Sequence, residues 1–548
     1  MQQAVAAFDD HRLRIFAKPP TLVATEEHAH LKLHVQSPPV KRLSWAVADE
    51  IVAMAASAAE EAVWWTFCKH YRDDAAAAAL WEKRDTNLDI SPDNSSGLLD
   101  GDIDTLLQTA FAEKIGPIDN LPEGYCLACR IFTVVEEFKQ RRRIIAWTRA
   151  TNAEERRILG AMKAAHFIVP FPRVGTLRRR ALYRYAAHLD LTKFFQQFEL
   201  VARKRYAFAH KGDVYVLATV PTGAVGPPLL AQILLRAVVC LSIRECSTGS
   251  LVVLDTMIDN ARICSNDFDA LTATWNRIHF HLSRLGSTVG DFLEPTEQPT
   301  YEFLGMLFDH KRLSVSPTAK AKTKIAGAVN TLRHRAADLT LADCFSLFGT
   351  TVWTAQVLDR PLAELYWVVK FIRRLSRRIP MQSMLSPTKV WPCIVDLWST
   401  WLETSITASC SITPLTPALK TIIAYTDASS TGWGAVIFDE DGVHVLAGTW
   451  TDAEMKLHIN EKELLAVWYM LRDYRPPTLP STGKRSMWLY IDNTTALSYV
   501  SKRNAKRYRP CSIIMGIEQL KENNGIDVEH VEYVSSAANF ADGPSRQH

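Results

Sequence analysis

The stretch IIAYTDASSTGWGAVIF, residues 422–438, contains two apolar runs separated by small and polar residues. The first run is typical of a buried strand, and Gly432 and Gly434 lead into the second as in a tight antiparallel hairpin. Asp427 therefore lies where the first strand ends. A buried, isolated carboxylate is costly unless it is paired or bound to a metal, although Asp, Ser and Gly are also ordinary turn residues. Other carboxylates able to reach Asp427 would decide between these interpretations.

Three of the acidic residues that follow Asp427 lie at a strand end or in a helix, namely Glu463, Asp492 and Asp542. After the hairpin, VHVLAGTW (443–450) is strand-like, and HINEKELLAVWYMLRDY (458–474) has the spacing of an amphipathic helix with Glu463 in its first turns. SMWLYIDNTTALSYV (486–500) repeats the pattern of an apolar strand, then Asp492, then a helix. IDVEHVEYV (526–534) alternates like a strand, and ANFADGPSR carries Asp542. The predicted order is β-β-β-α-β-α-α-β-α around a mixed sheet.

This order predicts a cluster of carboxylates. Strands that end side by side could bring Asp427 and Asp492 together, and Glu463 and Asp542 could join them from the flanking helices. Carboxylates this close repel one another and stay ionised only if divalent cations lie among them. Two Mg²⁺ ions would then activate water and neutralise the leaving oxygen in phosphodiester cleavage. The alternative is four unrelated surface acids on an α/β domain.

The motifs TDASSTGWGA, NEKELLAV, LYIDN and ANFADGPSR, taken together, closely resemble the ribonuclease H domain of retroelement polymerases. The resemblance spans about 125 residues and implies metal-binding roles for four residues, Asp427, Glu463, Asp492 and Asp542. The segment VEYVSSAANFAD lacks the histidine-bearing loop of some ribonucleases H.

A polymerase upstream would need its own carboxylate pair, because nucleotidyl transfer also uses two metal ions. HLDLTKFFQQFEL (188–200) places Asp190 at a strand end, and LVVLDTMIDNARICS (251–265) places Asp259 in a strand-turn-strand pattern. Between them, VLATVPTGAVGPPLLAQ (216–232) has a Pro-Thr-Gly turn before an apolar helix. Such a turn lets the backbone approach a template or an incoming nucleotide.

These segments resemble a reverse transcriptase palm. The resemblance implies metal-binding roles for Asp190, Leu191 and Asp259, the two aspartates being catalytic. Phe195 corresponds to the bulky residue under the sugar that excludes a 2′-hydroxyl. The tight turn that normally reads Tyr, any residue, Asp, Asp corresponds to Met257–Asn260. The turn that positions nucleotide and template corresponds to Pro221, Thr222, Gly223 and Pro228, with Gln232 after it.

Other segments fit the same resemblance. RRRIIAWTRATN (141–152) resembles the fingers strand that grips the triphosphate, which indicates Arg143, with Arg141 and Arg142 as alternatives. YEFLGMLFDH (301–310) resembles the hairpin that grips the primer. The implied substrate-binding residues are Arg143, Phe195, Pro221, Thr222, Gly223, Gln232 and Asn260.

Two basic stretches predict contact with nucleic-acid phosphates. Residues 311–335 contain seven Lys or Arg and no acid, where a thumb would track a duplex backbone. FIRRLSRRI (371–379) places two pairs of arginines one helical turn apart. Such stripes are usually solvated helix faces, but two together make a phosphate-contacting surface credible.

Three positions depart from the polymerase pattern. Asn260 replaces the second aspartate of the turn, Met257 replaces its tyrosine, and Phe194 is bulkier than the usual residue. Asparagine offers a carbonyl oxygen to a cation but no charge. The Asp-Asn variant resembles the tyrosine-recombinase retroelements (DIRS- and VIPER-like), while Gypsy-type LTR elements share most of the same signatures.

The predicted fold class is α/β and α+β multidomain, a right-hand polymerase followed by a ribonuclease H-like mixed sheet. The 548 residues divide into an N-terminal helical region of unknown role (1–120), fingers and palm (121–312), thumb and connection (313–415) and a ribonuclease H domain (416–548). PLTPALK (414–420) would be the hinge, and SPDNSSGLLDGD (91–102) a loop or linker.

Composition excludes several classes. With 47% hydrophobic and 22% charged residues, the chain is an ordinary core-forming protein, and no stretch approaches the roughly 18 to 20 uninterrupted apolar residues of a membrane span. The ten cysteines are spread thinly, and Cys126 and Cys129 lack partners at zinc spacing. We therefore expect an intracellular protein, nuclear or cytoplasmic, without a membrane.

The main hypothesis is an RNA-directed DNA polymerase with ribonuclease H activity. It implies Mg²⁺, two ions per active site with Mn²⁺ as the substitute, and the partners RNA template, DNA primer, RNA–DNA hybrid and deoxynucleoside triphosphates. The alternative is a catalytically impaired retroelement descendant that serves as an RNA-binding or assembly scaffold. A transposase- or resolvase-type nuclease would explain the last domain but not the palm motifs.

Overall fold

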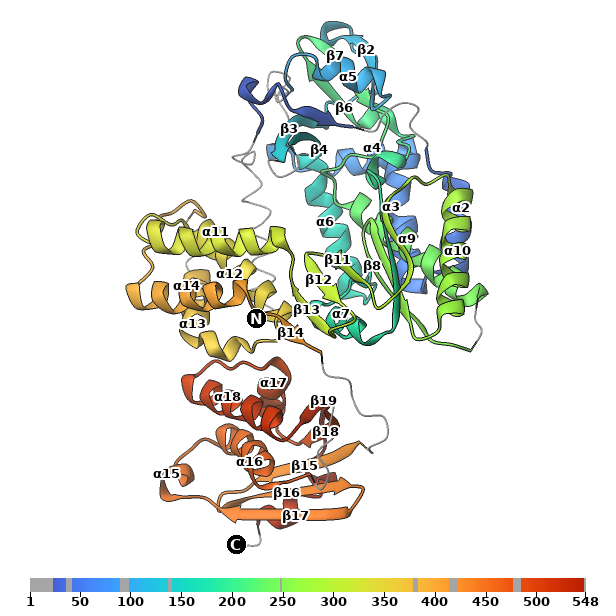
Figure 1. The fold of residues 1–548 in the computed structure, drawn as a ribbon. Coiled ribbons are helices and arrows are strands. Elements are labelled where there is room, and N and C mark those ends of the chain that lie inside the picture. Colours follow the sequence, from blue (N-terminus) through green and yellow to red (C-terminus); the bar gives the residue numbers. More distant parts are fainter. Residues whose placement is uncertain are drawn as a thin grey trace. The chain divides into compact units, whose positions relative to one another are not determined.

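The computed structural model describes residues 23–35, 42–88, 98–136, 140–246, 249–377, 383–412, 421–476 and 484–546. They form two compact units of mixed α/β structure (Figure 1). The N-terminal unit comprises the described residues of Phe16–Arg173 and Tyr183–Pro299. The C-terminal unit comprises Val174–Leu182 and the described residues of Thr300–His548. The predicted hinge 414–420 and most of the predicted loop 91–102 lie outside the described residues.

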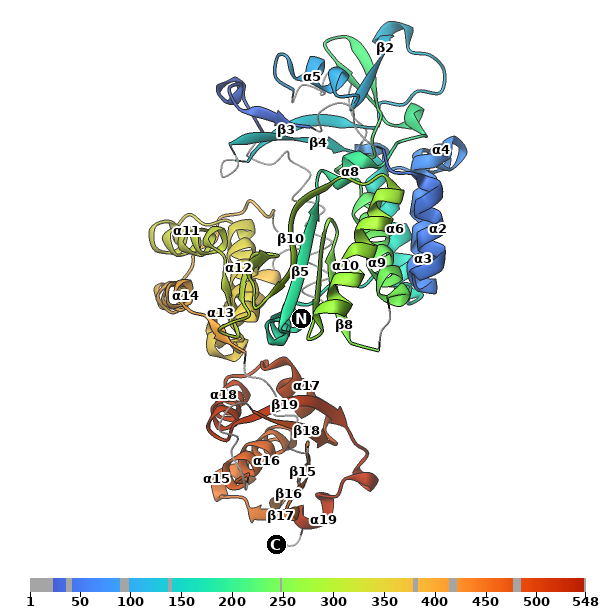
Figure 2. The same ribbon diagram turned by 45° about the vertical axis from the view of Figure 1, so that its right-hand side comes forward.

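A four-stranded antiparallel sheet lies at the centre of the N-terminal unit. Its strand order is β10 (Val289–Glu297), β5 (Tyr185–Leu191), β9 (Asn260–Ser265) and β8 (Val252–Met257). Helices α9 (Gly226–Glu245) and α10 (Phe268–Leu285) pack along these strands (Figure 2). Helices α2 (Trp45–Ala55) and α3 (Ala58–Arg72) cover α9 in turn. The β8–β9 turn and the end of β5 thus meet at one edge of this sheet.

Helix α9 is the core helix of this unit. Pro227 and Pro228 occupy its first turn, where a missing N–H costs nothing. Among the described residues, it is the one helix whose length and composition would suffice to cross a membrane, yet 78% of its apolar window is buried inside the unit. Its apolar surface is therefore accounted for by packing.

Two smaller sheets complete the N-terminal unit. One has the order β1 (Lys32–His34), β4 (Arg141–Trp147), β3 (Arg130–Glu136); the other has β2 (Ala112–Pro117), β7 (Asp213–Leu217), β6 (Ala207–His210). Residues before 120 thus supply a strand to each sheet, besides the helices α2, α3, α4 (Asp74–Glu82) and α5 (Asp102–Gln108). The predicted N-terminal helical region is helical only in part, because β1 and β2 complete sheets whose other strands come later in the chain. The remaining helices here are α6 (Arg149–Ala164) and α8 (Phe194–Gln197).

The C-terminal unit begins with a helical segment. Helices α11 (Ala319–Arg335), α12 (Leu341–Val357), α13 (Tyr366–Ser376) and α14 (Pro392–Ile406) share one apolar core. A sheet of β11 (Thr300–Phe303), β12 (Met306–Asp309), β13 (Ser314–Pro317) and β14 (Cys410–Ser411) adjoins them, and the short helix α7 (Val174–Arg178) packs on α12. We call residues 300–412 the helical segment.

The rest of the unit is a five-stranded sheet, called below the C-terminal domain. Its order is β17 (Gly442–Thr449), β16 (Gly432–Asp439), β15 (Ile422–Ala428), β18 (Arg485–Ile491), β19 (Ile526–Tyr533), with β15, β18 and β19 parallel. Its helices are α15 (Asp452–Met455), α16 (Ile459–Asp473), α17 (Thr494–Lys502), α18 (Tyr508–Asn523) and α19 (Asp542–Ser545). This is the predicted element order with the short α15 added.

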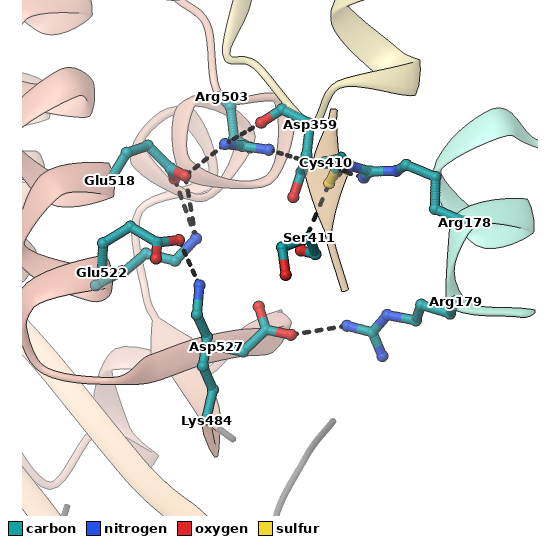
Figure 3. A network of polar contacts seen from close by, with 11 residues as sticks. Arg178, Arg179, Asp359, Cys410, Ser411, Lys484, Arg503, Glu518, Glu522 and Asp527 are labelled. Atoms are coloured by element: carbon teal, nitrogen blue, oxygen red, sulfur yellow. Dashed lines mark hydrogen bonds and ion pairs between the residues drawn. The ribbon is translucent and has the colours of Figure 1, made fainter. Parts of the chain in front are cut away.

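Hydrogen bonds and ion pairs connect the C-terminal domain with the helical segment (Figure 3). The Arg503 guanidinium bonds both the carboxylate and the carbonyl oxygen of Asp359, and its Nη2 lies 2.7 Å from Glu518 Oε2. Arg178 Nη2 donates to the same Asp359 carboxylate at 2.7 Å. Ala363 and Tyr366 of the helical segment also belong to the apolar core of the domain. The two parts therefore share buried surface as well as ion pairs.

Candidate metal centre and candidate polymerase site

Three carboxylates converge at one end of the C-terminal sheet. Asp427 is the penultimate residue of β15, and Asp492 follows the last residue of β18, which pairs with β15 in parallel. Glu463 lies in the first turns of α16, which packs on β15. Ligand oxygens of Asp427, Glu463 and Asp492 all lie within 4.8 Å of one another. The structure thus brings together three of the four acids that the sequence singles out.

Burial makes this cluster electrostatically unfavourable without a cation. Asp427 and Glu463 are each only 4% exposed. Burial, followed by the charges of Asp492 and Asp427, raises the pKa of Glu463 to about 9, and burial also raises the pKa of Asp427. Glu463 Oε2 is buried without a hydrogen-bond partner among the described residues. An unpaired buried oxygen among close carboxylates fits a divalent cation, which prefers oxygen ligands.

Asp542 lies beside the cluster rather than in it. It begins α19, and its Oδ1 lies 2.5 Å from Arg546 Nη2, one helical turn later. Its charge still reaches Asp427, where it contributes to the raised pKa. The group in this structure is thus Asp427, Glu463 and Asp492, while the predicted fourth member, Asp542, pairs with Arg546, the residue after α19.

Two serines bond the clustered carboxylates, and the sequence reasoning did not identify them. The Ser545 hydroxyl donates to Asp427 Oδ2, and Ser536 Oγ donates to Asp492 Oδ2 at 2.9 Å. Both serines lie within segments already recognised, VEYVSSAANFAD and ANFADGPSR. A serine in a turn is too common to indicate a bond to a carboxylate, so these two hydrogen bonds are visible only in the folded structure.

The cluster predicts a specific pH dependence in metal-free protein. The pKa of Glu463 is about 9 in the fold and 4.5 ordinarily, so between these values the folded state holds a proton that the unfolded state lacks. Its contribution to stability is full below pH 4.5 and declines as pH rises to 9, by about 1.4 kcal/mol per pH unit. Chemical unfolding in EDTA at pH 5.5, 7 and 8.5 should show Glu463→Gln gaining stability over wild type as pH rises. Parallel pH profiles would contradict this account.

Gly434 allows α19 to approach the sheet. It faces Asp427 across β15 and β16, and a Cβ on Gly434 would lie 2.5 Å from Ser545 N and 2.8 Å from Ala541 O. Because these are backbone atoms, Gly434→Ala must displace α19 and with it Ser545. We expect a loss of about 1 to 3 kcal/mol in the free energy of unfolding.

Thermal unfolding of Gly434→Ala measures this effect, with Gly327→Ala as the control. Gly327 lies in α11, and a Cβ there would meet no atom within 4 Å. An alanine in a helix interior is favourable, so the control should match or exceed wild type. Equal stability of the two variants would show that α19 does not depend on the close approach.

The second predicted site lies at the edge of the N-terminal sheet. Asp190 in β5 pairs with Asn260 across the β5–β9 ladder, and Asp259 occupies the β8–β9 turn. The Leu191 amide donates to the Asp259 carbonyl at 2.7 Å, and Asn260 Nδ2 donates to Asp259 Oδ1 at 2.8 Å. The structure therefore places Asp190, Leu191, Asp259 and Asn260 side by side.

The buried side chain of Gln232 forms hydrogen bonds with the backbone of this turn. Its Oε1 accepts from the Ile258 amide at 2.7 Å, and its Nε2 donates to the carbonyls of Pro170 at 2.8 Å and Thr256 at 3.1 Å. Ile258 has a φ of +62°, a strained value for a β-branched residue. With 1% exposure and both polar atoms bonded to protein, Gln232 positions the turn. This differs from the predicted contact with substrate, because the side chain is buried on the inner side of the turn.

The Pro221–Gly223 turn is bound against β4. Gly223 N donates to Ala146 O at 2.8 Å, and Asn152 Nδ2 donates to Gly223 O at 2.8 Å. Thr222 Oγ1 accepts from Ala146 N at 3.2 Å. A Cβ on Gly223 would lie 2.7 Å from Ala146 O, so the turn requires glycine. Pro228 lies in the first turn of α9.

The three candidate arginines of β4 have different environments. Arg142 is buried and donates to both oxygens of Asp102, at 2.6 and 2.8 Å. Arg141 Nε donates to Glu136 Oε2 at 2.5 Å. The Arg143 side chain is 52% exposed, with Nη1 3.7 Å from Glu136. Arg142 thus forms a buried ion pair within the protein. Triphosphate binding by Arg143 stays a prediction. The steric role of Phe195, which is half-buried in α8, also stays a prediction.

Comparison with known proteins identifies one part of the chain. Residues 418–515 match the family described as "RNase H-like domain found in reverse transcriptase". This match confirms the resemblance of the motifs to the reverse transcriptase/ribonuclease H region of a retroelement. The finer placement among retroelements stays a prediction. A search of curated proteins gives no match.

Among solved structures, the chain is similar to three foamy viral protease-reverse transcriptase complexes. The dRH form with ds DNA has 14% identity and a TM-score of 0.42 over 91% of this chain and 84% of that chain. The complex with RNA/DNA hybrid has 15% identity and a TM-score of 0.43 over 92% and 64%. The complex with dsDNA has 14% identity and a TM-score of 0.41 over 92% and 99%.

Proposed function

We propose, from the premise that residues 418–515 are an RNase H-like domain of the kind found in reverse transcriptase, that the C-terminal domain cleaves the RNA strand of RNA–DNA hybrids. The supporting observation is the group of three carboxylates with oxygens within 4.8 Å. Two of the three are buried, and Glu463 Oε2 has no hydrogen-bond partner among the described residues. Such a group favours divalent cations, which neutralise the repulsion between close carboxylates.

In this proposal Asp427, Glu463 and Asp492 hold divalent cations, with Mg²⁺ the expected ion, and Asp542 approaches from α19. Bound ions at such a site activate water and stabilise the leaving oxygen of a phosphodiester. Ser545 and Ser536 fix the orientation of the Asp427 and Asp492 carboxylates through their hydroxyl donors. The parallel pairing of β15 and β18 keeps those two carboxylates adjacent.

The same proposal assigns RNA-directed DNA synthesis to the N-terminal unit together with the helical segment of the C-terminal unit. The central sheet would serve as the palm, the two smaller sheets as fingers, and the helical segment as thumb and connection. The supporting observation is that Asp190 and Asp259 lie at the same sheet edge, with the Leu191 amide bonded to the Asp259 carbonyl. RNA template, DNA primer and deoxynucleoside triphosphates are the substrates that this assignment requires.

One observation favours a second candidate, a retroelement-derived RNA-binding or assembly scaffold. Asn260 stands opposite Asp190, where the family pattern has an aspartate, so the site has one negative charge fewer. In that case the chain would bind RNA or hybrid without incorporating nucleotides. A third outcome combines the two candidates: the C-terminal domain would cleave hybrids while the N-terminal unit would bind RNA without incorporating nucleotides.

A hybrid-cleavage assay tests the nuclease proposal. A hybrid labelled on its RNA strand is incubated with the full chain in Mg²⁺, in Mn²⁺ and in EDTA, beside matched RNA and DNA duplexes. The proposal expects cleavage of the RNA strand of the hybrid alone, only with a divalent ion. Binding of the hybrid without cleavage in either metal would favour the scaffold.

A further inference from the structure

Five side chains form two neighbouring aromatic and cationic groups on the C-terminal unit, linked by helix α13. The Tyr508 ring at the start of α18 stacks on Trp367 of α13, with centroids 5.8 Å apart and planes inclined by 27°. Lys370 Nζ lies 4.7 Å from the Trp367 centroid. Arg374, one turn later, has its Cζ 5.8 Å from the centroid of Trp391. We call Tyr508, Trp367, Lys370, Arg374 and Trp391 the α13 ladder.

The ladder leaves large aromatic faces in solvent. Tyr508 is 58% exposed, Trp391 50% and Trp367 46%. Trp367, Lys370 and Arg374 follow the three- and four-residue spacing that places side chains on one helix face. The opposite face of α13 packs inward, because Val368, Phe371, Ile372 and Leu375 are buried. The three aromatic side chains therefore keep about half of their surface in solvent, beside their contacts with Tyr366 and Phe371.

The surroundings of the ladder are cationic. Helix α13 and the first turn of α18 contain no acidic residue. Exposed Lys389 and Arg507 flank Trp391 and Tyr508 in sequence. Arg509 Nη1 lies 3.7 Å from Glu461, two residues before Glu463 of the metal centre. The ladder thus combines stacking faces with the positive charges of Lys370 and Arg374.

The ladder is also held in place before any ligand binds. Tyr366, next to Trp367, belongs to the apolar core of the C-terminal domain and packs on Tyr508 with centroids 5.5 Å apart. The Arg503–Asp359 contacts join the same two parts of the chain (Figure 3). Groups that are already ordered lose little conformational freedom on binding.

We propose that the α13 ladder binds single-stranded nucleic acid, outside the metal centre. Aromatic faces stack on unpaired bases of any sequence, and cations beside them contact the phosphates. Paired bases within a duplex do not offer their faces, so a blunt duplex should not use the ladder. The inference deepens the proposed function, since a nuclease on hybrids meets single-stranded RNA where the hybrid ends.

Binding of labelled 12-nucleotide oligo(U) and oligo(dT) to the full chain in EDTA tests the proposal by fluorescence anisotropy. Trp367→Ala with Tyr508→Ala should weaken binding of both by about 10- to 100-fold. Lys370→Gln with Arg374→Gln should weaken it and reduce the salt slope by about 1.4. A preference for one oligonucleotide would identify RNA or DNA as the source of the unpaired strand.

Trp65→Ala and Lys456→Gln are the matched controls, because both residues are exposed and lie outside the ladder. They should bind like wild type. Unchanged oligonucleotide affinity in both ladder variants, with unchanged far-ultraviolet circular dichroism, would overturn the proposal. Equal weakening for a blunt hybrid would also overturn it, because stacking on unpaired bases would then not be the cause.

Cleavage of a short blunt hybrid distinguishes this inference from the proposed nuclease. Trp367→Ala with Tyr508→Ala should cleave it at the wild-type rate, since these rings lie outside the metal centre and a blunt hybrid offers no unpaired base to them. If wild type cleaves no hybrid but ladder variants lose oligonucleotide binding, the nuclease proposal fails and the ladder stands. If wild type cleaves and ladder variants bind oligonucleotides normally, the ladder fails alone.

Discussion

Glu463→Gln is expected to reduce cleavage of an RNA–DNA hybrid by roughly 10³-fold, because loss of a metal-holding carboxylate removes several kcal/mol of transition-state stabilisation. Glutamine keeps the shape of the side chain and does not ionise, so the metal-free fold no longer has to keep Glu463 protonated beside Asp427 and Asp492. The metal-free variant should therefore fold at least as well as wild type. Initial rates of RNA-strand cleavage at saturating Mg²⁺ give the measurement, and circular dichroism confirms the fold.

Glu522→Gln is the matched control for this substitution. Glu522 lies on α18, is exposed, and its contact with Lys484 is on the surface. Surface ion pairs contribute little to stability, so this variant should cleave like wild type. Retention of most hybrid cleavage by Glu463→Gln would remove the carboxylate cluster from the mechanism, whatever the activity of the chain.

Asp190→Asn should abolish primer extension on an RNA template, with a loss of the same order, about 10³-fold. The proposed polymerase site has fewer acids than the pattern that it resembles, because Asn260 stands where a carboxylate is usual. Asp190 and Asp259 would then hold the cations together with the triphosphate, so the loss of either carboxylate would abolish nucleotide incorporation. Incorporation of a single deoxynucleotide by the full chain is the direct measurement.

The proposed nuclease activity provides the internal control for Asp190→Asn. Cleavage of a hybrid by this variant should remain at the wild-type rate, which excludes global unfolding as the cause. Asp100→Asn, an exposed aspartate paired with Lys211, should extend primers normally. Primer extension that survives Asp190→Asn would exclude the proposed palm, and absence of extension in wild type would favour the scaffold.

The carboxylate cluster was predictable because its positions follow from sheet geometry. Asp427 and Asp492 each end an apolar strand, and parallel strands that pair end at the same edge. Glu463 lies at the apolar face of an amphipathic helix, which must pack on that sheet. The pattern of apolar and polar residues therefore predicts that Asp427, Glu463 and Asp492 lie at the same end of the sheet. It does not fix Asp542, whose short helix is too brief to have a periodic pattern.

Other parts depended on contacts between distant segments. Gln232 has the position expected of a substrate contact, but its amide is directed into the β8–β9 turn by bonds to Ile258 and Pro170. Strands β1 and β2 were not foreseen because edge strands of three and six residues carry little alternation. The sequence does not show which of the three arginines of β4 is exposed. Asp102, about forty residues away, forms a buried ion pair with Arg142, and this contact is visible only in the structure.

The most direct measurement is anomalous diffraction from crystals of the chain soaked in Mn²⁺ with an RNA–DNA hybrid. The account predicts manganese density between the carboxylates of Asp427, Glu463 and Asp492 in wild type and its loss in Glu463→Gln. Density elsewhere, with those three carboxylates bound to no ion at saturating Mn²⁺, would contradict it.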